Sequence, residues 1–170
     1  VFLEDVINKC IEKAAAILND KNPDLENKED VAQKVGVGAV IFGALYNSKI
    51  KDIVFSYDKV LNFEGETSVY VQYTCARACG GVARAQNNGM EDLSSPVSLT
   101  GCELTEEDNA LVKTLALFPD KVAQALHEYE PSVITRYILD VCADFNRFYH
   151  DVQILSCEDE ALRAFRVKLT

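Results

Sequence analysis

Helical periodicity recurs along most of this 170-residue chain and limits its fold more than any other feature of the sequence. The clearest case lies between Pro131 and Tyr149, where apolar residues alternate at intervals of four and three: Ile134, Ile138, Val141, Phe145 and Phe148. This spacing places all five on one face of an α-helix, as expected for a helix that packs against others. The sequence therefore predicts a mainly α protein.

Similar patterns predict helices on both sides of this one. We expect helices over about 3–20, 30–46, 67–87, 105–117, 119–129 and 131–149, and the start of another after residue 158. Capping signals support two starts, because Thr67 or Ser68 precedes one helix and Thr105 is followed three residues later by Asp108. Residues 50–55 have strand-forming character, so they would pair with a strand outside the chain or form an extended linker. The expected fold is a helical bundle preceded by helices and one extended segment.

The helix expected over 30–46 carries three glycines, Gly36, Gly38 and Gly43. Each glycine weakens a helix by roughly 1 kcal/mol relative to alanine. Close approach of a second backbone is the simplest reason to keep them. We therefore expect another chain segment to press against this helix.

The charge balance argues against a general surface for polyanions. The chain has 27 Asp and Glu residues against 17 Lys and Arg, so its formal net charge is −10 and long-range attraction to nucleic acid or anionic membrane is weakened. No apolar run approaches the roughly 20 residues that a membrane-spanning helix needs. The first ten residues, VFLEDVINKC, do not have the pattern of a secretory signal. We expect a cytoplasmic protein with no membrane or DNA partner. Any site that binds a polyanion would be confined to a small part of the surface.

The cysteines stand among apolar neighbours rather than in close pairs around turns: Cys10, Cys75, Cys79, Cys102, Cys142 and Cys157. We therefore expect them to be reduced and buried in a cytosolic protein. Cys75 and Cys79 are four residues apart and could share a helix face as metal ligands. No Cys-x-x-Cys motif occurs, however, and the chain has only two His residues, so we expect no metal site.

No catalytic centre can be recognised in the sequence. It contains no phosphate-binding glycine loop, no Ser/His/Asp arrangement and no Cys/His pair in a recognisable context. Acidic residues cluster at 26–30 and 106–108, but both clusters stand at predicted helix starts, where the helix dipole and solvation account for them. No catalytic residue is therefore expected in this chain.

Residues 67–90 reverse the local sign of the charge, since they include no Asp or Glu and carry two arginines. At about 100° per residue, five side-chain positions fall within roughly 80° of one another on the predicted helix. They are Tyr70, Tyr73, Arg77, Gly81 and Arg84. The tyrosines could half-bury at a helix interface while the arginines lie over neighbouring acids. Alternatively, this stripe could bind unpaired bases through ring stacking and guanidinium contacts, with Gly81 letting an RNA backbone come close.

The order of residues from Phe55 to Arg77 resembles the segment that joins the catalytic and anticodon-binding domains of arginyl-tRNA synthetases. The most specific part is the string Phe-Glu-Gly-x-Thr-x-x-Tyr-x-Gln-Tyr-x-x-x-Arg, which begins at Phe63. The stretches VGVGAVIFGAL, LALFPDKVAQAL and FNRFY are also similar to the family, so the likeness covers essentially the whole chain. Val69, where the family usually has Pro, and Gly80 with Gly81, where it has bulkier apolar residues, depart from the pattern.

The resemblance implies a class I synthetase that joins arginine to its tRNA with ATP and Mg²⁺. Residues 1–66 would be the end of the catalytic domain, and residues 67–170 most of a helical domain that binds the anticodon loop of tRNA-Arg. The family's nucleotide-binding motifs would precede Val1 and its final helix would follow Thr170, so we expect this chain alone to be inactive. The family's pocket for the middle anticodon cytosine maps to four residues: Tyr70, Tyr73, Arg77 and Tyr149.

Two other functions are compatible with the helical pattern. One is a protein-interaction module with no RNA role, which salt-dependent binding of an anticodon stem-loop would distinguish. The other is the anticodon-binding domain of another class I synthetase, such as a cysteinyl enzyme. The Phe-Glu-Gly string favours arginine.

Overall fold

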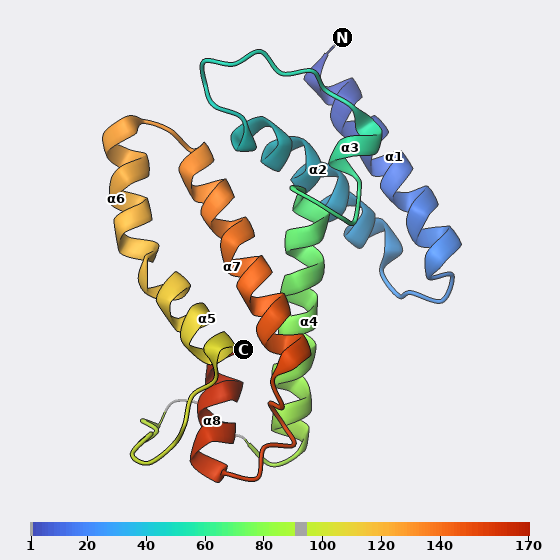
Figure 1. Ribbon diagram of the computed structural model, residues 1–170. Coiled ribbons are helices and arrows are strands. Elements are labelled where there is room, and N and C mark those ends of the chain that lie inside the picture. Colours follow the sequence, from blue (N-terminus) through green and yellow to red (C-terminus); the bar gives the residue numbers. More distant parts are fainter. Residues whose placement is uncertain (1, 91–94) are drawn as a thin grey trace. The chain divides into compact units, whose positions relative to one another are not determined.

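The computed structural model describes residues 2–90 and 95–170, in which helices are joined by loops (Figure 1). The helices are α1 (Leu3–Lys21), α2 (Lys28–Tyr46), α3 (Tyr57–Val60), α4 (Ser68–Asn87), α5 (Glu106–Ala116), α6 (Phe118–Glu128), α7 (Ser132–Asp151) and α8 (Glu160–Leu169). No strand occurs in the described residues, and residues 50–55 form neither helix nor strand. The predicted mainly α fold is confirmed.

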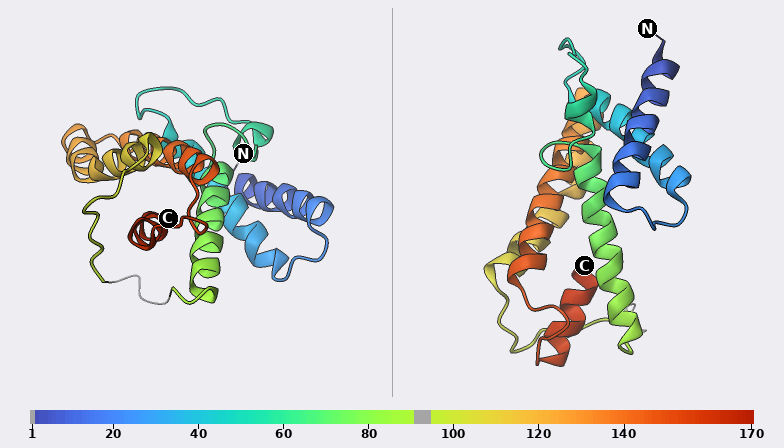
Figure 2. Two further views of the ribbon diagram at one scale, coloured as in Figure 1. Left: turned by 60° about the horizontal axis from the view of Figure 1, so that its bottom comes forward. Right: turned by 90° about the vertical axis from the view of Figure 1, so that its right-hand side faces the viewer.

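The chain divides into two compact units, each made of two segments. The first contains Val1–Tyr73 and Ala123–Arg136, and the second contains Thr74–Val122 and Tyr137–Thr170. In the first unit α1 and α2 lie side by side (Figures 1 and 2). Their small buried residues, among them Ala14, Ala32 and Ala39, form a core with Leu61.

A close approach of α1 and α2 accounts for one of the three glycines of α2. A Cβ atom built on Gly36 would lie 2.6 Å from the backbone nitrogen of Ile11, which is closer than real Cβ contacts. A side chain at this position would force the two helices apart. The expectation of a backbone pressed against this helix is thus confirmed at Gly36. At Gly43 the nearest atom is instead a methyl carbon of Val60, 3.2 Å away.

Four side-chain hydrogen bonds hold the segment 123–136 within the first unit. Lys49 donates from Nζ to the backbone oxygens of Glu128 and Tyr129, at 2.6 and 3.0 Å. Thr135 donates from Oγ1 to the backbone oxygen of Leu45 at 3.3 Å. Ser48 donates to Glu130 in the same region, at 3.0 Å.

The apolar stripe predicted on α7 supplies the core of the second unit. Phe145 and Phe148 are buried together with Leu111 of α5 and with Val152, which follows α7. The capping box predicted at the start of α5 is present: Thr105 Oγ1 accepts from the backbone N–H of Asp108, and Asp108 accepts from that of Thr105. The shared apolar core packs α5 against α7, and the capping box fixes where α5 begins.

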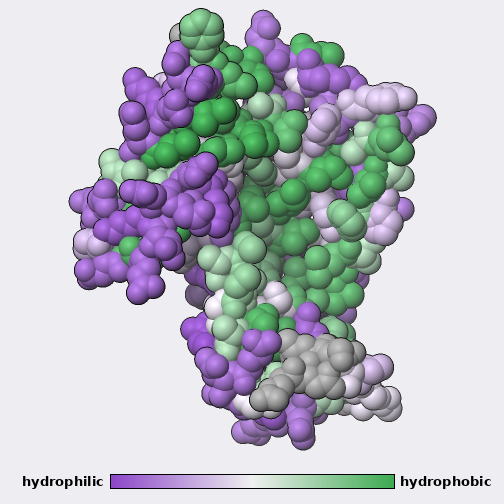
Figure 3. Space-filling view, turned by 180° about the vertical axis from the view of Figure 1, so that it is seen from behind, coloured by the Kyte–Doolittle hydropathy of each residue, from purple (hydrophilic) through white to green (hydrophobic). Residues whose placement is uncertain are grey.

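An apolar area of the second unit stays exposed on α5 and at the start of α6. Leu115 and Phe118 are 40% and 53% exposed, and together with Tyr137, Ile138 and Val141 they line a hollow of about 340 Å³. Hydrophobic surface is visible in green on the right of Figure 3.

The expectation that all six cysteines are buried is wrong for Cys75 and Cys79, which are exposed, and for Cys102, which is partly exposed. Buried Thr74 and Ala85 mark the packed side of α4 in the second unit, and Cys75 and Cys79 lie on another side of that helix. All six thiols are free. In residues 2–90 and 95–170, no three His, Cys, Asp or Glu side chains are grouped as metal ligands, and no helix is long and apolar enough to cross a membrane.

Candidate nucleic-acid interface

The second unit brings together four of the residues singled out in the sequence: Arg77, Gly81, Arg84 and Tyr149. The first three lie on α4 at intervals of four and three residues, which places them on one side of that helix. Tyr149 lies in the last turn of α7. Their meeting point is therefore where α4 and the end of α7 come together.

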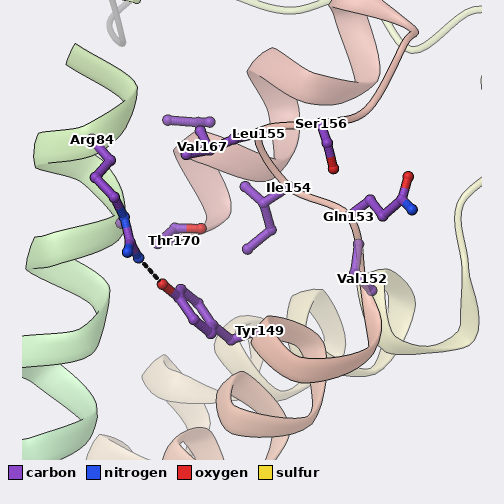
Figure 4. Close-up of a pocket in the computed structure, with 10 residues that line it drawn as sticks. Arg84, Tyr149, Val152, Gln153, Ile154, Leu155, Ser156, Val167 and Thr170 are labelled. Atoms are coloured by element: carbon purple, nitrogen blue, oxygen red, sulfur yellow. Dashed lines mark hydrogen bonds between the residues drawn. The ribbon is translucent and has the colours of Figure 1, made fainter. Parts of the chain in front are cut away.

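Tyr149 contacts both arginines. The guanidinium carbon of Arg77 lies over its ring, 5.3 Å from the ring centroid, which is a cation–π geometry. Arg84 donates from Nη2 to the hydroxyl oxygen of Tyr149 (Figure 4). The ring of Phe145 lies on the same helix, with its centroid 5.7 Å from that of Tyr149. These three contacts restrict the orientation of the tyrosine ring.

Asn146 is a polar residue of this region that sequence reasoning did not single out. Its Oδ1 accepts from Nη1 of Arg77 at 2.9 Å, and its Nδ2 donates to Oγ1 of Thr74 at 2.9 Å. Asn146 lies three residues before Tyr149, so both project from one side of α7. That spacing, inside the Phe145–Tyr149 stretch, is the signal from which Asn146 could have been found.

The structure changes the expected role of Gly81. This residue is buried, and a Cβ atom built on it would lie 3.2 Å from Cγ2 of Thr170 and 3.4 Å from Cε2 of Tyr149. Protein atoms thus occupy the space in which we expected an RNA backbone. The missing side chain of Gly81 instead lets Tyr149 and the end of α8 come close to α4.

A pocket of about 290 Å³ opens beside these residues (Figure 4). Its lining comprises Gly81, Arg84, Tyr149, Val152, Gln153, Ile154, Leu155, Ser156, Val167 and Thr170. Arg84 from α4 and Tyr149 from α7 point toward one another at its edge, and the segment between α7 and α8 forms another part of the wall. Apolar walls, an aromatic ring and one guanidinium group suit a flat ligand with polar edges, such as a nucleobase.

The other two predicted residues, Tyr70 and Tyr73, belong to the first unit. They lie in the first turns of α4, where Thr67 Oγ1 accepts from the backbone N–H of Tyr70 at 3.2 Å. Tyr70 is half-buried and Tyr73 is 53% exposed.

Comparison with known protein families identifies the larger part of the chain. Residues 71–170 match the model of the DALR anticodon binding domain. The chain belongs to this family. Ahead of the DALR domain, residues 1–57 match the model described as tRNA synthetases class I (R), catalytic domain. All the residues around the pocket lie within the DALR domain.

Two similar proteins bear the same name. The chain is 51% identical over 170 residues to the arginine–tRNA ligase of Halothermothrix orenii and 46% identical over 169 residues to that of Clostridium botulinum strain Alaska E43. Each match covers 99% of this chain and 29% of the relative, so the chain spans less than a third of the relatives' length.

Solved structures give the same result for the fold. The arginyl-tRNA synthetase of Thermus thermophilus is 31% identical, with a TM-score of 0.85 over 99% of this chain and 28% of that chain. The arginyl-tRNA synthetase of Plasmodium falciparum shares the fold, with a TM-score of 0.78 over 99% of this chain and 30% of that chain. Its sequence is 19% identical. The resemblance to arginyl-tRNA synthetases that the Phe-Glu-Gly string predicts is confirmed.

Proposed function

We propose that this chain is part of an arginine–tRNA ligase and that it supplies binding of the anticodon loop of tRNA-Arg. The names of the relatives and the DALR family both support this proposal. They favour it over a protein-interaction module and over the cysteinyl alternative. Residues 1–66 would then end the catalytic domain, and residues 67–170 would form the anticodon-binding part.

One observation carries the proposed site: Tyr149 is held by Arg77 over its ring and by Arg84 at its hydroxyl group, beside a pocket of about 290 Å³. An unpaired base that stacks on an aromatic side chain gains about 1–3 kcal/mol. An arginine next to such a ring adds contacts to the base edge or to a phosphate oxygen. We assign Tyr149 and Arg77 to the middle cytosine and the exposed Arg84 to a phosphate.

The remaining assigned residues contribute from α4. Tyr70 and Tyr73 offer ring faces, and helical spacing supports their inclusion because they continue the stripe of Arg77 and Arg84. Gly81 takes part indirectly, because it leaves the room that Tyr149 occupies.

The ligase reaction would consume ATP, as a complex with Mg²⁺, and arginine in the cytoplasm. We assign no residue of this chain to those substrates.

Binding of anticodon stem-loops to the complete synthetase tests the proposal. A stem-loop from tRNA-Arg should bind more tightly than one in which the middle cytosine is replaced by a purine. The affinity of the synthetase for both stem-loops should fall with rising salt concentration, because binding of either stem-loop includes contacts to phosphate groups. Equal affinities for the two stem-loops, or no measurable affinity for either, would contradict the proposed recognition of the middle base.

A further inference from the structure

We infer that Asp108 and Arg166 position the pocket wall formed by residues 152–156 and thereby control how firmly the pocket holds a base. This inference rests on the proposed function. Neither residue lines the pocket or touches a base, so both would act as positioning residues.

The two side chains form a two-fold contact inside the second unit. Arg166 donates from Nε to Oδ1 of Asp108 at 3.1 Å and from Nη2 to Oδ2 at 2.8 Å. The side chain of Asp108 is fully buried, and that of Arg166 is 7% exposed. Burial raises the pKa of Asp108, but hydrogen bonds from Arg166 and Thr105 outweigh it and hold that pKa below its usual value.

A third hydrogen bond connects this pair to the pocket. Nη1 of Arg166 donates to the backbone oxygen of Gln153 at 3.1 Å. Gln153 lines the pocket, as do its neighbour Val152 and Val167, the residue that follows Arg166. One guanidinium group therefore joins the start of α5, α8 and the segment between α7 and α8.

The geometry requires arginine in particular. A guanidinium group carries five N–H donors in a rigid plane, so it can contact both carboxylate oxygens and a backbone oxygen at once. A lysine ammonium at the end of a flexible stem is a point charge and cannot reproduce this fork. Lysine at position 166 would keep the charge opposite Asp108 and lose the fixed contact to Gln153.

Arg163 provides a matched control on the same helix. Its Nη1 donates at 2.8 Å to the backbone oxygen of Cys157, in the same connecting segment. Cys157 does not belong to the pocket lining, whereas Gln153 does. The variants Arg163→Lys and Arg166→Lys thus make the same chemical change at two points of one segment.

Hydrogen exchange of the complete synthetase without RNA tests the positioning itself. In Arg166→Lys the amide of Val152, which donates to the backbone oxygen of Phe148 at 3.0 Å and directly precedes Gln153, should exchange about five- to tenfold faster, because the charged hydrogen bond that restrains this segment is lost. In Arg163→Lys the exchange rate at Val152 should stay as in the parent. Unchanged rates in Arg166→Lys would overturn the inference.

Charging kinetics then test the consequence for tRNA. Arg166→Lys should raise the KM for tRNA-Arg about five- to tenfold with little change in kcat, and Arg163→Lys should leave both unchanged. Faster exchange with an unchanged KM would also overturn the inference, because the wall would then not matter for binding. A parent enzyme with no preference for the middle cytosine would contradict the proposed function, while the exchange rates would still decide the positioning.

A second variant keeps the test valid if Arg166→Lys does not fold. The double variant Asp108→Asn with Arg166→Gln removes both charges together, so no buried charge is left unpaired. Glutamine is too short to replace the three contacts of Arg166. The double variant should show the same faster exchange at Val152, and a parental exchange rate there would contradict the inference.

Discussion

Arg84 donates a hydrogen bond from Nη2 to the hydroxyl oxygen of Tyr149 and so joins α4 to the last turn of α7. Arg77, two turns earlier on α4, lies over the ring of the same tyrosine. The two arginines therefore contact different parts of one aromatic side chain. Substitutions of Tyr149 can separate these contacts.

Removing only the hydroxyl group should affect the Arg84 contact. In Tyr149→Phe the ring, its stacking surface and the Arg77 contact remain, while the hydrogen bond from Arg84 is lost. We expect a loss of about 0.5–1.5 kcal/mol in the free energy of unfolding, measured with urea, and a preserved preference for the middle cytosine. A lost preference would mean that the hydroxyl group, rather than the ring face, reads the base.

The two arginines should differ in their effect on specificity. Arg77→Ala frees the ring of Tyr149 and should lower discrimination for the middle cytosine by about 1–3 kcal/mol, measured by charging of tRNAs that differ at this base. Arg84→Ala should weaken all anticodon stem-loops alike, as the loss of a phosphate contact does. The reverse pattern would show that the pocket-lining Arg84 reads the base. If neither variant changes the preference, the stripe on α4 is purely structural.

The adjacent glycines of α4 should respond differently to alanine. Gly80 is exposed, and no atom outside its own helix backbone lies within 4 Å of a Cβ atom built there. Gly80→Ala should therefore raise the free energy of unfolding by about 1 kcal/mol. At Gly81 the added carbon would lie 3.2 Å from Thr170 and 3.4 Å from Tyr149. Gly81→Ala should therefore raise the free energy of unfolding by less than Gly80→Ala does, or lower it. Equal gains would show that Tyr149 is not held close to α4.

The Asp108–Arg166 pair should make stability depend on pH in the acid range. The pKa of Asp108 is lowered in the folded state, so its contribution is complete above the usual value of 3.8 and is lost as pH falls through the folded-state pKa. The stability of the parent is compared with that of the double variant Asp108→Asn with Arg166→Gln. The single variant Asp108→Asn is unsuitable, because it would leave a buried arginine unpaired at a cost of about 3–5 kcal/mol. Urea unfolding from pH 7 to pH 3 should show the free energy of unfolding of the parent falling relative to that of the double variant at the acid end. A parallel decline of both proteins would contradict the assignment.

The sequence predicted those parts of the fold that depend on local spacing. The stripe containing Phe145 and Phe148 predicted α7 and its buried face, and Thr105 with Asp108 predicted the start of α5. Gly36 indicated a close contact between helices, because a glycine destabilises a helix and close packing is the simplest reason to keep one there. Each of these signals lies within a few residues of the feature that it predicts.

Features that depend on long-range packing were not predicted. Asp108 and Arg166 are 58 residues apart, and the capping role of Asp108 already explained an acid at that position. The exposure of Cys75 and Cys79 depends on which side of α4 receives α7, and the pattern of apolar residues on α4 did not reveal it. The space beside Gly81 is likewise filled by residues from two later helices.

The central claim is that Tyr149 and its arginines hold the middle base of the anticodon. The most direct test is the ratio of kcat/KM for tRNA-Arg with cytosine and with a purine at that position, in the complete synthetase and in Tyr149→Ala. Tyr129→Ala serves as the control, because Tyr129 is 79% exposed and belongs to the other compact unit. We predict that Tyr149→Ala lowers this ratio by a factor that corresponds to about 1–3 kcal/mol, and that Tyr129→Ala leaves it unchanged. An unchanged ratio in Tyr149→Ala would contradict the claim.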